Sequence, residues 1–470
     1  MLARVVVIAA VLMLAACKTF SPDGGLGLTA NIADRELHKD TIAIRSQDDA
    51  DAASARVRRL LKRPLTADGA VQIALLNNRG LQAAYNELGI AEAVSVRQSL
   101  PPNPSVSISR ISGSVETEID RQIVGNILAL ATLPARSEIA EDRFRQAQLV
   151  AALETLRVAA ETRRAFYRAV GAQEMIGLLT QAESAAATSA RLAKRLGESG
   201  AMNKLDQARE QVFHTDIATQ LTRARQRAAT ERERLIRLLG LSGDDLDFAL
   251  QNAPPALPRR ARVLRLVEQD AVSRRVDLQI ARIELETLAK SYGLTQATRF
   301  INVLDAGYAD KITNNKETGE HIRDRGFTVT FEVPLFDFGE ARVREAEQTY
   351  MQAVNRLAEK AVNVRSQARA AYNTYRSSYE IASRYQREVL PLRKTISDEM
   401  MLRYGAMQVD VLSLLNDARQ RIAANIAAAE ARRDFWIASV DLSAAIIGGG
   451  ASGTETQSAT MSTADNAAGH

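Results

Sequence analysis

The chain has 470 residues, 46% of them hydrophobic but only 5% aromatic, and a formal charge of +5 at neutral pH. So few aromatic residues argue against a thick globular core and favour long helices that pack along narrow seams. The basic balance would suit a nucleic-acid binder, but acids and bases alternate along the chain, as in residues 231–234, Glu-Arg-Glu-Arg. We interpret these charges as solvated helix faces and not as a nucleic-acid-binding stripe.

The N-terminus has the shape of a secretory signal peptide, over residues 1–16. Arg4 precedes an apolar run that is shorter than the ~20 residues of a membrane-spanning helix, and small residues end the run. Residues 14–17, Leu-Ala-Ala-Cys, resemble a bacterial lipobox, which implies cleavage before Cys17 and lipid on its thiol and new amino group. An ordinary signal that ends near a buried cysteine is the alternative. Cys17 is the only cysteine, so a covalent lipid is the one cofactor expected, with no disulfide and no thiolate metal site.

Residues 17–64 are expected to form a lipid-anchored extension, with glycines and a proline first and a short helix near 50–61. The first firm helix is predicted from residue 65, with Thr66 as its N-cap, to about residue 100, because the prolines at 101, 102 and 104 cannot continue it. A β-hairpin follows at about 104–128, since residues 105–112 alternate polar and apolar side chains. Long helices are then predicted at about 136–196 and 203–239, followed by a break.

The same order of elements then returns. We predict a helix at 261–296, a second β-hairpin at about 299–334, and helices at about 340–402 and 408–446, with a disordered tail over 448–470. The last strand alternates most cleanly: Phe327, Val329 and Phe331 would suit lipid, whereas Thr328 and Thr330 would suit water.

The long helix after the second hairpin carries a seven-residue repeat, which predicts a coiled coil of about 70 Å over residues 350–396. Its seam residues recur at steps of four and three, and all but Ser378 are apolar: Tyr350, Val354, Leu357, Ala361, Val364, Ala368, Ala371, Tyr375, Ser378, Ala382, Tyr385, Val389, Leu392 and Ile396.

An internal duplication organises the whole chain. Residues 164–167, Arg-Ala-Phe-Tyr, match residues 369–372, Arg-Ala-Ala-Tyr, at an offset of 205, and Gly-Ala-Met at 200–202 returns at 405–407 with the same offset. We therefore predict two tandem repeats, 65–255 and 256–447, each consisting of a helix, a β-hairpin and two further helices. The fold class is mainly α, with two hairpins.

The four predicted strands cannot close a barrel within one chain, because about eight strands are the minimum. If the strands meet lipid, each unpaired edge group would cost several kcal/mol. Several chains must then pool their strands, and a homotrimer would supply twelve.

The sequence resembles the TolC family of outer-membrane efflux ducts over about residues 65–446. The likeness lies in the run from Leu65-Thr66 to Leu81, in Pro102-Asn103-Pro104, in residues 333–339 (Val-Pro-Leu-Phe-Asp-Phe-Gly) and in Tyr404-Gly405 with residues 410–412 (Asp-Val-Leu). It implies a homotrimer whose strands form a 12-stranded outer-membrane β-barrel and whose helices form a periplasmic α-barrel. It also implies a periplasmic adaptor and an inner-membrane pump as partners, in a passive duct without catalytic residues.

The resemblance also assigns roles at the helix-to-helix turns. Asp410 matches an aspartate that narrows the entrance as an aperture gate, although Ser413 stands where a second acid is frequent. Asp206 could form a latch with Arg403 or Tyr404, or could simply be an acid at a helix start. Two tips are expected to dock the adaptor: Gly197, Gly200, Ala201 and Met202 in the first, and Gly405, Ala406 and Met407 in the second.

Other functions find less support in the residues. The four histidines are scattered without ligand spacing, and no phosphate-binding loop or nucleophile motif occurs, so neither a metal site nor an enzyme is expected. The main alternative is a lipid-anchored periplasmic coiled-coil scaffold without a pore, which would have no use for two lipid-facing hairpins. The cargo stays open among drugs, metal ions and proteins.

Overall fold

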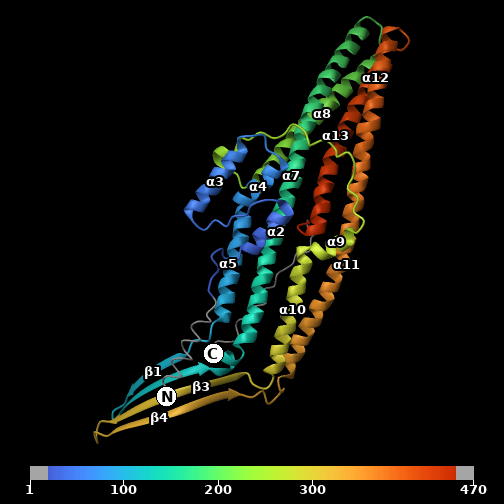
Figure 1. The fold of residues 1–470 in the computed structure, drawn as a ribbon. Coiled ribbons are helices and arrows are strands. Elements are labelled where there is room, and N and C mark those ends of the chain that lie inside the picture. Colours follow the sequence, from blue (N-terminus) through green and yellow to red (C-terminus); the bar gives the residue numbers. More distant parts are fainter. Residues whose placement is uncertain (1–18, 451–470) are drawn as a thin grey trace. The chain divides into compact units, whose positions relative to one another are not determined.

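The computed structural model describes residues 19–450, and its elements are long helices and one antiparallel sheet of four strands (Figure 1). The predicted fold class, mainly α with two hairpins, is confirmed. Cys17, the predicted signal peptide at 1–16 and residues 451–470 of the predicted tail lie outside the described residues. Within the described part of the chain, no helix has both the length and the apolar character needed to cross a membrane.

The described chain divides into two compact units. The first contains residues 19–55, Leu76–Thr155 and Arg265–Arg369, and the second contains Arg56–Leu75, Leu156–Leu264 and residues 370–450. The hairpins of both sequence repeats therefore belong to the first unit, and the helix-to-helix turns of both belong to the second.

Three helices precede the helix that leads into the first β-hairpin: α2 (Gly27–Leu37), α3 (Gln47–Leu61) and α4 (Ala67–Asn77). The single helix predicted from residue 65 to 100 is wrong, because it breaks at Asn78 into α4 and α5 (Arg79–Ser99). Asn78 has an extended backbone, and its side chain accepts a hydrogen bond from Leu81 N at 3.0 Å, so it caps a new helix.

The second repeat breaks at the equivalent place. The helix predicted at 261–296 is α9 (Val267–Arg274) and α10 (Val276–Ala297), separated by Arg275. Arg275 has φ −66° and ψ 121°, close to the −69° and 115° of Asn78. The two residues are 197 positions apart, the same offset that relates Leu81 to Leu278. The duplication therefore extends to backbone features that the apolar pattern does not reveal.

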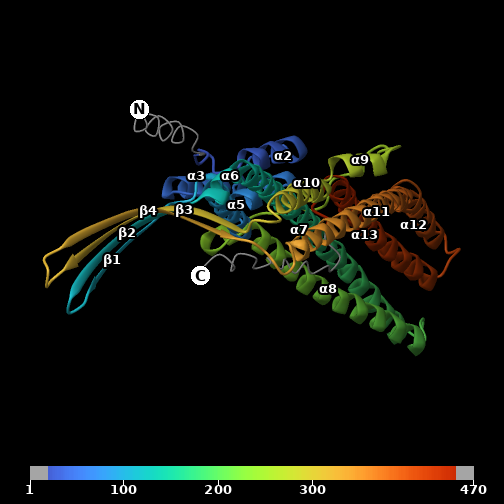
Figure 2. The same cartoon turned by 90° about the horizontal axis from the view of Figure 1, so that it is seen from below.

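The sheet follows chain order, and its strands are β1 (Ser105–Ser112), β2 (Glu116–Asn126), β3 (Val303–Asn315) and β4 (His321–Glu332). All three pairings are antiparallel and continuous in register, and the middle one joins the two hairpins. Figure 2 shows the four strands curving together, side by side. Short helix α6 (Ile127–Ala131) follows β2.

A tight turn leads from β4 into the next helix. Gly339 has φ +72°, and a Cβ there would lie 2.3 Å from the carbonyl oxygen of Arg299. Only glycine fits this approach without moving the backbone.

Long helices α7 (Leu133–Glu198) and α11 (Glu340–Arg384) contribute to both units. In the second unit α7 packs with α8 (Lys204–Leu239) and α13 (Val411–Ile447). One buried cluster of this packing contains Leu179, Leu221 and Ala224, with Ile426 of α13 against it. The core here is a narrow seam of small and aliphatic side chains, as the composition predicts.

The predicted heptad seam holds only in part. Its members from Tyr350 to Val389 are buried or half-buried, but Leu392 and Ile396 are 62% and 43% exposed. The helix has a π turn at Tyr385–Val389, between α11 and α12 (Leu390–Gly405). A π turn inserts an extra residue, so the seam changes phase beyond it.

The π turn has a local cause in Pro391. Proline has no N–H to bond the carbonyl of Arg387, four residues earlier, and its ring crowds that carbonyl. After the π turn the half-buried positions of α12 are Leu390, Arg393, Ser397 and Met400, whereas Leu392 and Ile396 are exposed.

The connection between the repeats is extended and is held by aromatic side chains of the second unit. The hydroxyl oxygens of Tyr372 and Tyr375 accept hydrogen bonds from the backbone N–H groups of Leu264 and Arg262, at 3.2 and 3.1 Å. Trp436 donates to the carbonyl of Pro255 at 2.9 Å. These bonds satisfy backbone groups that have no helix or sheet partner.

Candidate functional site

The strand register assigns every side chain of the sheet to one of two faces, because directly opposite residues share a face. Val106 lies opposite Ile123, Ile123 opposite Tyr308, and Tyr308 opposite Phe327. The rings of Tyr308 and Phe327 are 5.5 Å apart. We call the face that contains this row the apolar face, and the other the polar face.

The apolar face is open. Ile108, Phe327, Val329 and Phe331 are 63–87% exposed. Side chains of this size gain about 1.5–3 kcal/mol each when they are removed from water. A contiguous apolar patch without cover marks a surface that meets a partner or a membrane.

The polar face carries small polar and acidic side chains. Thr328 and Thr330 lie on it, so the predicted alternation of this strand matches the register. Within the strands this face has one lysine and six carboxylates, a net charge of −5. The lysine is Lys311, which pairs with Glu118 at 2.9 Å. The carboxylates are those of Glu116, Glu118, Asp120, Asp305, Asp324 and Glu332.

Both outer strands end the sheet without a pairing partner among the described residues. The order is β1-β2-β3-β4, and every residue of β1 and of β4 is exposed. Unpaired strand edges are templates for another chain, and natural sheets normally block them with charge, proline or a bulge. Neither β1 nor β4 contains proline, and the register of their pairings has no bulge. The charges of β4 stand near its two ends, so residues 326–331 form an uncharged edge.

At the first tip, α7 ends at Glu198 and α8 starts at Lys204. Gly200 has φ +76°, and the backbone N–H groups of Ala201 and Met202 bond back to the carbonyl of Leu196 at 2.8 and 3.1 Å. This turn needs a residue in the left-handed region, which glycine supplies without strain.

The second tip, between α12 and α13, differs in its backbone. Gly405 is still helical, and the left-handed residue is Met407, with φ +61° and a side chain that is 94% exposed. The helix thus ends at Gly405, but the left-handed residue is the methionine of Gly-Ala-Met in the second tip and the glycine in the first. An exposed methionine in a strained backbone conformation costs about 1–2 kcal/mol.

Asp410 caps α13. Its Oδ1 accepts a hydrogen bond from Ser413 N at 2.9 Å, and its side chain is exposed. Hydrogen bonds from the side chain and backbone of Ser413 hold the pKa of the Asp410 carboxyl below its usual value. The carboxylate is therefore ionised at neutral pH, as a charged aperture would require.

The candidate latch residues have other partners in this chain. Asp206 is buried beside Asn203, whose Nδ2 donates to it at 2.7 Å, and it pairs with Arg209 at 2.9 Å. Arg403 lies 3.7 Å from Glu399, and Tyr404 is partly exposed. The latch stays a prediction.

Two ion pairs that link helices of the second unit were not expected. Glu210 of α8 pairs with Arg419 of α13 at 2.6 Å, and Glu174 of α7 pairs with Arg432 of α13. Burial raises the pKa of Glu210 and of Glu174, and the paired arginines offset this only in part. The sequence shows abundant glutamate and arginine here, but no spacing rule pairs residues 209 and 258 positions apart.

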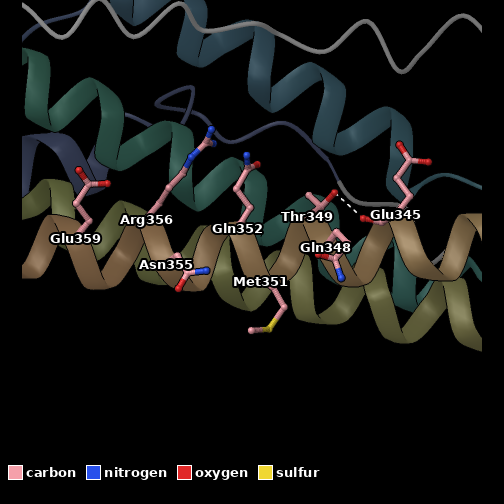
Figure 3. Close-up of a pocket in the computed structure, with 8 residues that line it drawn as sticks. All are labelled: Glu345, Gln348, Thr349, Met351, Gln352, Asn355, Arg356 and Glu359. Atoms are coloured by element: carbon pink, nitrogen blue, oxygen red, sulfur yellow. Dashed lines mark hydrogen bonds between the residues drawn. The ribbon is translucent and has the colours of Figure 1, made fainter.

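A hollow of about 650 Å³ lies along α11 and is drawn in Figure 3. Its lining comes from one helix and is mostly polar, including Glu345, Gln352, Arg356 and Glu359. In the described part of the chain, no group of three or more His, Cys, Asp or Glu side chains could hold a metal ion. We assign no ligand to the hollow, because side chains from one helix face do not surround a ligand from several sides.

Solved structures with the same fold include outer-membrane channels. The CmeC outer membrane channel of Campylobacter jejuni has a TM-score of 0.67 at 15% sequence identity, covering 87% of this chain and 89% of that chain. CusC, described in connection with transmembrane channel formation, has a TM-score of 0.66 at 16% identity, covering 83% and 92%. The MtrE channel of Neisseria gonorrhoeae, in its open state, has a TM-score of 0.63 at 14% identity, covering 84% and 89%.

No protein-family model matches the sequence, and no curated protein sequence is similar to it. Because the solved structures are only 14–16% identical in sequence, their likeness establishes the fold alone. The TolC-like fold predicted from the sequence is therefore confirmed over most of the chain.

Proposed function

We propose that the chain is the outer-membrane subunit of a trimeric export duct, which carries cargo passively from a periplasmic adaptor and an inner-membrane pump to the exterior. The observation that carries the proposal is the sheet. One of its faces is apolar and uncovered, the other is polar and acidic, and both edges lack a partner in the part of the chain that the structure describes. A membrane β-barrel needs all three features, whereas a soluble protein is harmed by the first and the third.

Three copies of the four-stranded sheet would supply twelve strands, with β1 of one chain paired to β4 of the next. The twelve residues of β4 extend about 40 Å at ~3.4 Å per residue, and a tilt near 40° leaves a height of about 30 Å. This height covers the apolar band of about 25 Å that outer-membrane barrels present. At the helix end of the sheet, Phe300, Phe336 and Phe338 are 57–105% exposed, where an aromatic interfacial belt is expected.

The helical hairpins would lie in the periplasm, with the tips at Gly200 and Met407 directed towards the adaptor. Exposed side chains at the second tip support this role, because Met401, Leu402 and Met407 are 61–94% exposed. Lipid on Cys17 would add an anchor to the outer membrane beside the barrel.

The proposed duct does no bond chemistry. The polar face of the sheet, with its net charge of −5 per chain, would line the lumen, and Asp410 would form a ring of three carboxylates at the second tip. The acidic face and the Asp410 ring would both favour cations in the water-filled path.

A lipid-anchored scaffold without a pore is the alternative, and closure of the sheet distinguishes the two. The test introduces a cysteine on each edge strand, Ser107→Cys on β1 and Thr328→Cys on β4, both on the polar face. In membranes from cells that express the double variant, a bifunctional maleimide should produce covalent trimers on a denaturing gel.

Each single variant and the wild-type chain, which carries only Cys17, serve as controls and should remain monomeric on the same gel. A double variant that also remains monomeric, although both cysteines react with a monofunctional maleimide, would contradict the closed trimer and favour the scaffold.

A further inference from the structure

Charged side chains on the apolar face are confined to two adjacent rows near the hairpin turns. One row is Ile108, Arg121, Asp310 and Arg325, and the next is Arg110, Ile119, Ile312 and Arg323. With four arginines and one aspartate, this part of the face has a net charge of +3, opposite in sign to the polar face of the same strands.

The four arginines are not equivalent. Arg323 makes two bonds of 2.7 Å to the carboxylate of Asp310, and Arg325 lies 3.4 Å from the same group. Arg110 and Arg121 are exposed diagonal neighbours about 7–8 Å apart, and neither makes an ion pair among the described residues. Arg121 lies directly opposite Asp310, but the Asp310 carboxylate is engaged by the two arginines of β4. Within residues 19–450, no carboxylate neutralises this pair of guanidinium groups.

The position of the arginines along the strands fits the edge of a membrane. The exposed apolar rows run from Phe331 to Phe327, and Arg325 and Arg323 follow at the next two positions on the same face. Arg323 therefore lies about 26 Å along the strand from Phe331, at ~3.3 Å per residue, or about 20 Å in height at a tilt near 40°. Its long side chain can span the remaining distance to the edge of an apolar band of about 25 Å. Arginine is costly at the centre of a lipid bilayer but reaches the headgroup level from near its edge.

We infer that Arg110, Arg121, Arg323 and Arg325 form a cluster that binds the phosphate groups of lipid headgroups in the outer leaflet. The inference rests on the proposed function, because only a barrel in the membrane turns this face to lipid. The guanidinium group suits phosphate, since its planar fork donates two parallel hydrogen bonds to one anion. Asp310 holds the two arginines of β4 in place and leaves Arg110 and Arg121 free to take the ligand.

The test is a binding titration of the full-length trimer in neutral detergent with bisphosphorylated lipid A, followed by native mass spectrometry, with phosphatidylcholine as the reference lipid. The Arg110→Gln/Arg121→Gln variant leaves no carboxylate unpaired. It should bind lipid A about 25-fold more weakly than wild type, at about fivefold for each arginine. Binding of phosphatidylcholine should not change.

Lys311→Gln is the matched control, because Lys311 lies at the same level on the polar face. It should bind lipid A as wild type does. An equal loss in this control, or no loss in the double variant, would overturn the assignment to the cluster.

Pore formation separates this inference from the proposed function. The Arg110→Gln/Arg121→Gln protein should form pores with the conductance of wild type. If wild-type protein forms pores but binds lipid A no more tightly than phosphatidylcholine, the inference is overturned and the proposed function stands. Trimeric wild-type protein without any pore would overturn the function on which the inference rests.

Discussion

Asp410 combines two physical roles at one position. Its carboxylate accepts the Ser413 N–H and so caps α13, and it also places an ionised charge at the tip. An aperture gate needs the charge, whereas a helix start needs only the acceptor, which asparagine supplies as well as aspartate does.

Asp410→Asn and Asp410→Ala separate these roles. Both variants should weaken the block of the pore by multivalent cations, because both remove three charges from the proposed ring. Asp410→Ala should in addition destabilise the start of α13 by about 1 kcal/mol. If Asp410→Asn is blocked as strongly as wild type and only Asp410→Ala changes, the residue is a cap and not a gate.

Met407 shows where residue-level prediction stops. The repeat of Gly-Ala-Met at 200–202 and 405–407 indicates two equivalent turns, and the structure has two turns, but only the first has its glycine in the left-handed conformation. Sequence alignment pairs residue types, whereas backbone conformation depends on where each helix ends. Helix α12 runs to Gly405 itself, whereas α7 ends two residues before Gly200, and Met407 takes the strained position.

At the scale of elements, Tyr85 joins two helices of the first unit through a buried hydrogen bond. Its hydroxyl lies 3.0 Å from Oγ1 of Thr155, which itself donates to the carbonyl of Ala151, so the tyrosine is the donor. Burial raises the pKa of Tyr85 to about 12, from an ordinary value of 10.0. The neutral phenol is thus favoured in the folded protein.

This shift predicts an alkaline sensitivity. Because the folded pKa is the higher one, the stability from the neutral phenol is complete below pH 10 and is lost as the pH rises towards 12. Tyr85→Phe should cost about 1 kcal/mol at pH 8 through the lost hydrogen bond. Between pH 10 and 12 the free energy of unfolding should fall less for Tyr85→Phe than for wild type, and the difference should reach about 2–3 kcal/mol. Urea unfolding followed by circular dichroism, at pH 8 and at several values between pH 10 and 12, measures both effects. If the free energies of unfolding of the two proteins fall in parallel with pH, the prediction is contradicted.

The elements that the sequence predicts best are those with one uninterrupted period. Alternation located both hairpins, and the seven-residue repeat located the long helix up to Val389. The breaks at Asn78 and Arg275 were missed because apolar residues continue past them with helical spacing. Asn78 carries a readable cap signal, but Arg275 makes no side-chain cap hydrogen bond, so nothing local marks it.

For the whole molecule, the candidate site depends on register more than on composition. Alternation predicts which residues of one strand share a face, and it placed Phe327 and Thr328 on opposite faces correctly. It cannot predict that β2 pairs with β3 across 177 residues of sequence, from Asn126 to Val303. That pairing unites the acidic residues of both hairpins on one face and the arginines on the other, and the chain's net charge of +5 conceals both groups.

Single-channel conductance tests the central claim most directly. Purified full-length protein, shown to be trimeric by light scattering, is added to a planar lipid bilayer. The proposed function predicts discrete, long-lived pores that select cations, since the polar face and Asp410 both present carboxylates to the path. Folded, trimeric protein that produces no pores would contradict the duct and leave a lipid-anchored scaffold as the function.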